Sequence, residues 1–155
     1  HPGSLQYSWL EKELANSDTK WKFVCHHHPP YSSDENDYGN LWKTNQGKHG
    51  DQRARALVPL YEKYRVDVVW NGHIHSYERT WRVLGGQAVE SGGPFYMITG
   101  GGGGGLETPA PTRPFFQNNV RRGHHYVMVH INGGILEIKA FTLDDRLLDY
   151  HKILK

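Results

Sequence analysis

Two groups of histidines contain the residue types in this sequence that are best suited to chemistry. Residues 26–28 are all histidine and follow an apolar run that ends at Cys25, while His73 and His75 follow the apolar run 66–70. Imidazole is the commonest side-chain ligand for borderline metal ions such as zinc and iron. Two histidines separated by one residue, just beyond a buried strand, can aim at one small volume. The spacing therefore predicts a metal site.

The elements around these histidines predict how they meet. Residues 21–25 and 66–70 have the composition of buried strands, and between them Asp51 is placed to cap a helix. Strand, helix and strand in this order form a parallel βαβ unit, in which ligands collect at the carboxyl ends of the strands. Both histidine groups follow those ends. A preceding helix, capped by Ser4, has Leu5, Trp9, Leu10 and Leu14 at helical spacing.

The second half of the chain has a different pattern, which predicts mostly antiparallel sheet. Hairpin signals occur at Asn132-Gly133-Gly134 and Asp144-Asp145. The predicted strands are residues 80–84, 95–99, 126–131, 135–142 and 146–153. No internal repeat or domain boundary is visible, so residues 1–155 are expected to belong to one domain, with residues 1–4 consistent with a cloning remnant.

Composition narrows the functional classes. The 18 Lys and Arg against 16 Asp and Glu give a net charge of +2, too close to neutral to indicate a nucleic-acid or membrane surface. No run approaches the roughly 20 apolar residues of a membrane helix, and no signal peptide is visible. The single cysteine, Cys25, lies in an apolar run, which favours a buried inert thiol over a nucleophile.

The remaining candidate residues leave alternatives open. At most two of residues 26–28 can face one site, because neighbours on an extended segment point to opposite sides. His49, on the long polar loop 28–50, could reach the site as an acid or could be an ordinary exposed histidine. Residues 100–105 are all glycine but lack the Gly-Lys-Ser/Thr ending of a phosphate loop, so they form either a flexible loop or a backbone segment close to a ligand. The other histidines are expected to be structural or on the surface: His124, His125, His130 and His151.

The sequence resembles the metallophosphoesterase (calcineurin-like) superfamily, and within it the purple acid phosphatases. The resemblance rests on His27-His28-Pro29-Pro30-Tyr31, which fits the family's His-x-Pro-x-Tyr, and on Gly-His-Ile-His-Ser-Tyr-Glu-Arg at residues 72–79. It implies the family's four-layer αββα sandwich, an α/β (α+β) fold of which this chain would be the C-terminal half. That half is a βαβ unit followed by antiparallel strands, expected to supply one sheet and its covering helices.

The resemblance also implies site roles. It makes His27 and His73 ligands of one metal ion, His75 a ligand of a second, and His49 a residue that contacts the phosphate and protonates the leaving oxygen. The imidazoles of His27, His73 and His75 should then converge on two ions about 3.5–4 Å apart, drawn from Fe, Zn and Mn. The implied activity is hydrolysis of a phosphate ester by a bimetal-activated hydroxide, in a parent protein expected to be secreted or periplasmic.

The family's early motifs are missing from this sequence. Asp-x-His does not occur ahead of the two histidine groups, Gly-Asp-x-x-Tyr and Gly-Asn-His-Asp/Glu do not occur at all, and Asp34, Asp37 and Asp51 lie in the wrong context to replace them. The chain alone is therefore expected to be inactive. One alternative is a non-catalytic degenerate module of the same fold that binds a metal or a partner. Another, a mononuclear zinc hydrolase, lacks a carboxylate spaced to act as its base.

The expectation that this chain is only the C-terminal half of the sandwich has a structural consequence. In a two-sheet sandwich the inner faces bury each other, so the face that includes Phe23, Val68, Trp70 and Met97 is expected to lack its cover. A missing N-terminal half, self-association or the chain's own strands would have to cover it.

Overall fold

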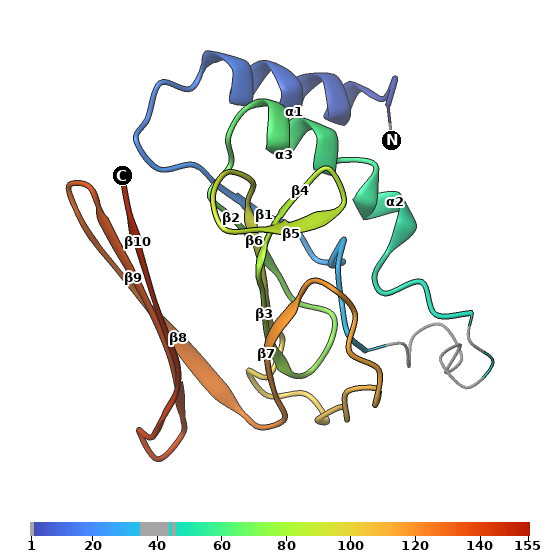
Figure 1. Ribbon diagram of the computed structural model, residues 1–155, viewed down its shortest axis with the longest axis vertical. Helices are drawn as coiled ribbons and strands as arrows, with labels where there is room; N and C mark the ends of the chain where they lie inside the picture. Colours follow the sequence, from blue (N-terminus) through green and yellow to red (C-terminus); the bar gives the residue numbers. More distant parts are fainter. Residues whose placement is uncertain (1, 35–43, 45) are drawn as a thin grey trace.

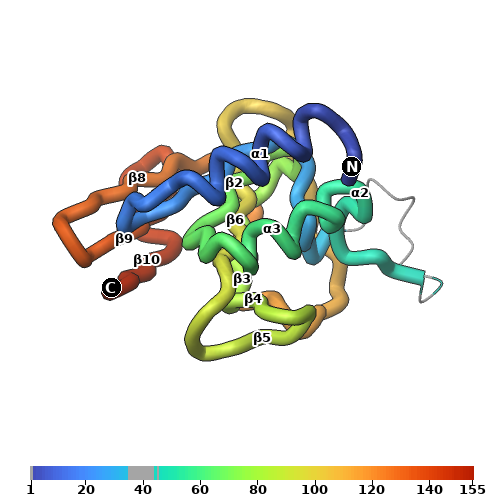
Figure 2. The backbone as a smooth tube through the Cα atoms, turned by 90° about the horizontal axis from the view of Figure 1, so that it is seen from above, coloured from blue at the N-terminus to red at the C-terminus, as the bar shows by residue number. Residues whose placement is uncertain are grey.

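The computed structural model describes residues 2–34, 44 and 46–155. Two β-sheets pack face to face, and two of the three helices, the first and the third, cover the outer side of the larger sheet (Figures 1 and 2). The helices are α1 (Leu5–Asn16), α2 (Gln52–Arg55) and α3 (Val58–Lys63). The strands are β1 (Phe23–Cys25), β2 (Val68–Asn71), β3 (Tyr77–Thr80), β4 (Arg82–Leu84), β5 (Gln87–Val89), β6 (Phe95–Thr99), β7 (Gln117–Arg121), β8 (His125–Asn132), β9 (Ile135–Thr142) and β10 (Leu147–Leu154).

The larger sheet has the strand order β1-β2-β6-β3-β7. Its β1 and β2 run parallel with Phe23 opposite Val68, as the βαβ pattern predicts. Residues 95–99 form β6, which runs parallel to β2 on one side and antiparallel to β3 on the other, so the mostly antiparallel second half includes one parallel pairing. The sheet becomes antiparallel only at β3 and β7. Strand β7 was missed because its Gln-Asn-Asn sequence has low strand propensity.

The helices follow their predicted caps but differ in detail. The side chains of Ser4 and Asp51 accept hydrogen bonds from the third residue beyond each, at 3.1 and 2.7 Å. Two helices, α2 and α3, follow Asp51 where one was expected. The helix is interrupted because Pro59, in the first turn of α3, has no N–H to continue the backbone hydrogen bonds of α2. The apolar stripe of α1 is also narrower than expected, since Leu5 and Trp9 are exposed. No helix among the described residues is long and apolar enough to cross a membrane.

The second sheet, β10-β9-β8, changes the prediction of an uncovered inner face. Val68 and Met97 are fully buried, because Leu136 and Ile138 of β9 pack against them. The chain thus supplies strands to both sheets of the sandwich rather than one sheet and its helices. Phe23, by contrast, is 39% exposed, so the inner face of the larger sheet is uncovered at this residue, as predicted.

The location of Cys25 corrects a second prediction. The thiol is exposed rather than buried. Among the described strands β1 pairs only with β2, so it forms an edge of the larger sheet. Cys25 lies two residues beyond Phe23 and shares its exposed face.

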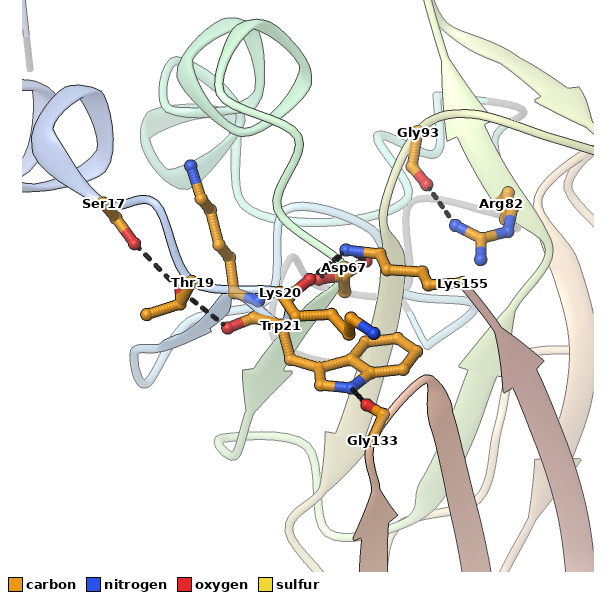
Figure 3. A network of polar contacts seen from close by, with 10 residues as sticks. Ser17, Thr19, Lys20, Trp21, Asp67, Arg82, Gly93, Gly133 and Lys155 are labelled. Atoms are coloured by element: carbon orange, nitrogen blue, oxygen red, sulfur yellow. Dashed lines mark hydrogen bonds and ion pairs between the residues drawn. The ribbon is translucent and has the colours of Figure 1, made fainter.

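Polar contacts around Asp67 join the two sheets at the amino-terminal ends of β1 and β2 (Figure 3). The buried carboxylate of Asp67 accepts from the backbone N–H of Lys22 at 2.8 Å and pairs with the ammonium of Lys155 at 2.7 Å. Lys155 also lies over the ring of Trp21, whose Nε1–H donates to the carbonyl of Gly133 in the β8–β9 turn. These contacts fix the sandwich at the end opposite the histidines.

Candidate metal centre at the carboxyl ends of the parallel strands

The pairing of β1 with β2 continues past both strands and brings the two histidine groups together. The N–H of His26 donates to the carbonyl of Trp70, and the N–H of Gly72 donates to the carbonyl of His27, each at 3.1 Å. Beyond these bonds His27 Nε2 and His73 Nδ1 lie 3.1 Å apart. Two nitrogens that share a tetrahedral zinc ion are about 3.3 Å apart, given Zn–N bonds of about 2.0–2.1 Å. The observed spacing therefore fits a shared ion.

His73 is held in an uncommon backbone conformation. Its φ is 67°, in the left-handed region, and the N–H of Ile74 donates to the carbonyl of Gly72 at 2.8 Å to close a three-residue turn around it. Such a conformation costs a non-glycine residue about 1–3 kcal/mol and is found mostly at functional sites. Gly100 makes the turn possible, because a Cβ there would lie 2.1 Å from the carbonyl oxygen of Ile74.

His28 joins this pair. Its ring centroid is 4.0 Å from that of His73 and 5.0 Å from that of His27. One nitrogen of each ring lies within 4.8 Å of the others, and in the part of the chain that is described these three residues form the only histidine, cysteine or acidic group compact enough for a metal ion. The third neighbour, His26, turns away to stack on Tyr61, so two of the three consecutive histidines face the site.

His75 packs against the glycine run. Its Nδ1–H donates to the carbonyl of Gly105 at 2.7 Å, and the carboxylate of Glu107 lies 3.9 Å from the same nitrogen. A Cβ at Gly104 would come within 2.6 Å of the ring. The glycine run therefore passes directly against the ring of His75, a predicted metal ligand. His75 lies outside the compact group of the other three rings.

His49 lies at the base of the long loop, beside the segment that carries the first histidines. Arg55 donates from Nη2 to the carbonyl of His49 at 2.5 Å and from Nε to that of Pro30 at 3.0 Å. The next residue, Gly50, has a φ of 121° and leaves no room for a side chain, since a Cβ would lie 2.2 Å from Pro30 O. The ring of His49 packs edge-on against Phe116 with centroids 6.2 Å apart. The structure thus fixes its backbone near the site but does not bring its ring into the compact group.

A buried carboxylate supports the same loop and was not singled out from the sequence. Glu78 is 1% exposed and accepts two hydrogen bonds from Ser33, from its N–H at 2.9 Å and its hydroxyl at 2.6 Å. Burial raises the pKa of Glu78 to about 7, although the hydrogen bonds from Ser33 oppose this shift. A glutamate within the otherwise buried strand β3 was the available signal, but its partner lies 45 residues away.

A cleft of about 700 Å³ adjoins the histidines. Its lining includes Trp9 and Leu10 of α1 together with His27 and His28. An organic group attached to an anion at the histidines could therefore lie against apolar side chains.

Comparison with known proteins places these features in a family. The model of the calcineurin-like phosphoesterases matches residues 1–77, which contain all the predicted ligands. The chain is 34% identical over 81% of its length to purple acid phosphatase 22 of Arabidopsis thaliana, and 29% identical over 97% to a nucleotide pyrophosphatase/phosphodiesterase of Hordeum vulgare. The chain belongs to the calcineurin-like phosphoesterase family.

The fold of this calcineurin-like phosphoesterase chain matches that of the purple acid phosphatases. The structure of purple acid phosphatase PPD1 from yellow lupin superposes with a TM-score of 0.87 over 99% of the chain, at 23% identity. The chain spans 29% of that structure, and 29% and 40% of the Arabidopsis and barley relatives.

Proposed function

We propose that this chain is part of a phosphoric ester hydrolase of the purple acid phosphatase type. The observation that carries the proposal is the 3.1 Å approach of His27 Nε2 to His73 Nδ1, at the strand ends where the family sequence pattern predicts ligands. Iron, zinc and manganese all suit a site of imidazoles and carboxylates. When bound, two such ions would supply a hydroxide nucleophile near neutral pH and would neutralise charge on the phosphoryl oxygens.

Different residues of this chain would have different roles in the reaction. His27 and His73 would hold one ion. The hydrogen bond from His75 Nδ1–H to Gly105 O leaves Nε2 as the nitrogen with a lone pair, which would hold the second ion. His49 would contact the phosphate and donate a proton to the leaving oxygen. The Arg55 contacts fix the backbone from which His49 would act.

The other ligands would come from outside this sequence. Within it no Asp-x-His precedes the histidine groups and no Gly-Asp-x-x-Tyr or Gly-Asn-His motif occurs, so this chain by itself should not hydrolyse phosphate esters. We propose a partner segment that carries these motifs and packs on the exposed apolar side chains of β1 and β8, among them Phe23, Val129 and Ile131. A second copy of this chain is the alternative cover. Secretion or a periplasmic location of the whole protein is part of the same proposal.

The test is hydrolysis of p-nitrophenyl phosphate by the whole protein that the gene encodes, loaded with iron, zinc or manganese. His73→Ala should abolish turnover, whereas the matched control His130→Ala, an exposed histidine on β8, should not change it. His49→Ala should lower kcat more than it raises KM, because a general acid acts mainly in the transition state. A whole protein that binds metal but never hydrolyses the substrate would favour the non-catalytic module instead.

A further inference from the structure

His28 has a place in the structure that neither the spacing of the histidines nor the family pattern assigns to it. In the pattern His-x-Pro-x-Tyr it occupies the unspecified position. Its ring nevertheless lies 4.0 Å, centroid to centroid, from that of His73, closer than the 4.9 Å between His27 and His73. This position beside the predicted ligands suggests that His28 itself has a role at the metal centre.

The distances are compatible with ligation of one ion by three imidazoles. His27 and His73 already have nitrogens 3.1 Å apart, and all three rings offer a nitrogen within 4.8 Å of the others. Tetrahedral zinc needs separations of about 3.3 Å. The side chain of His28 is 50% exposed, so a change of its torsion angles can close the remaining gap without displacing the core.

The surroundings of His28 favour the ligating orientation. The N–H of Asp51 donates to the carbonyl of Pro29 at 2.8 Å, which anchors the chain just beyond His28. The carboxylate of Asp51 caps α2 through Oδ1 and presents Oδ2 3.9 Å from His28 Nδ1. A carboxylate on the Nδ1 side stabilises the proton there and leaves Nε2 as the donor to a metal, the usual arrangement around ligating histidines.

We propose that His28, together with His27 and His73, forms a three-imidazole site for a single divalent transition-metal ion within this chain. The proposal rests on the assignment of His27 and His73 as ligands in the proposed function, and adds His28. Such a site needs no ligand from another segment, and its exposure leaves the fourth coordination position to water, as in open zinc sites. Imidazole ligands favour zinc, copper and nickel over magnesium or calcium.

The experiment is titration of the purified chain with Zn²⁺ by calorimetry and with Co²⁺ by visible absorption. The wild-type chain should bind one equivalent with the absorption of a four-coordinate ion. His28→Ala should weaken binding at least about tenfold, as should His73→Ala, while His130→Ala should have no effect. X-ray absorption of the zinc-loaded wild type should count three imidazoles, a reading that needs no variant to fold.

The outcomes separate this inference from the proposed function. Loss of affinity in His27→Ala and His73→Ala but not in His28→Ala, or a count of two imidazoles, would refute the role of His28 and leave the proposed hydrolase intact. A wild-type chain that binds no ion would refute the three-imidazole site, while hydrolysis by the whole protein would still decide the proposed function. Weakened binding in His75→Ala equal to that in His28→Ala would also count against it.

Discussion

The buried carboxylate of Glu78 should make the stability of the chain fall as the pH rises. Its pKa is about 7 in the folded chain against an ordinary value of 4.5, because burial disfavours the charged form. The folded state therefore binds more protons than the unfolded state between these pH values. The stabilisation is complete below about pH 4.5 and is lost as the pH rises through about 7. Its full size is about 3 kcal/mol.

Glu78→Gln isolates this effect. A glutamine can keep both contacts with Ser33, because its carbonyl accepts from the Ser33 N–H and its amide donates to the hydroxyl. The variant should fold and should not titrate at this position. The free energy of unfolding of the wild type, relative to the variant, should fall by about 2–3 kcal/mol between about pH 5 and pH 8, which corresponds to a relative shift in Tm of about 5–10 °C.

The measurement is urea or thermal unfolding of both chains at several pH values, with Glu90→Gln as a control for loss of an exposed carboxylate. The comparison cancels the contributions of the half-buried His26 and the buried His125, because both chains retain them; burial lowers the pKa values of these histidines, and they act in the opposite direction. Parallel stability curves for the wild type and Glu78→Gln across this range would show that Glu78 is not buried as described.

Three further changes follow from particular contacts. Gly104→Ala should lower the zinc affinity of the whole protein about 10–100-fold, because the added methyl group pushes away the ring of His75, a predicted ligand. Gly103→Ala is the control and should leave the affinity unchanged, because a Cβ there meets nothing within 4 Å. Equal affinities of the two variants would contradict the close approach of Gly104 to His75. Burial lowers the pKa of His151 to about 4, so stability should rise between about pH 4 and 6.5, and His151→Asn should flatten this rise in the same unfolding assay. Asp149→Ala should lower the free energy of unfolding, measured in urea, by about 3–5 kcal/mol, because it leaves the buried guanidinium of Arg79 without the carboxylate 2.6 Å away. Replacing both Arg79 and Asp149 by apolar residues should lower the free energy of unfolding by less.

Local patterns in the sequence were enough to predict the elements that carry the site. Apolar runs identified β1 and β2, and the caps Ser4 and Asp51 marked where α1 and α2 begin. Their order required parallel pairing, so the approach of the segments after β1 and β2 could be anticipated. These features depend on residues close together in the chain, and for this reason they can be read from it.

The tertiary structure alone decided which side chains meet. His28 rather than His75 lies with His27 and His73, because the turn around His73 and the contact of His75 with Gly105 set the directions of the rings. These directions depend on the backbone of a loop that arrives 30 residues later. No local pattern contains that information.

The burial of individual residues likewise depended partly on local sequence and partly on the tertiary structure. The chain's own composition favoured buried strands, but it did not say which faces would be covered. Val68 is buried because β9 folds back over it from more than 65 residues away, whereas Cys25 is exposed because β1 is an edge of its sheet in the described chain. The sequence by itself determined β1 and β2 and the histidines at their ends. Only long-range packing determined their neighbours, because contact between distant segments depends on the whole fold rather than on either segment.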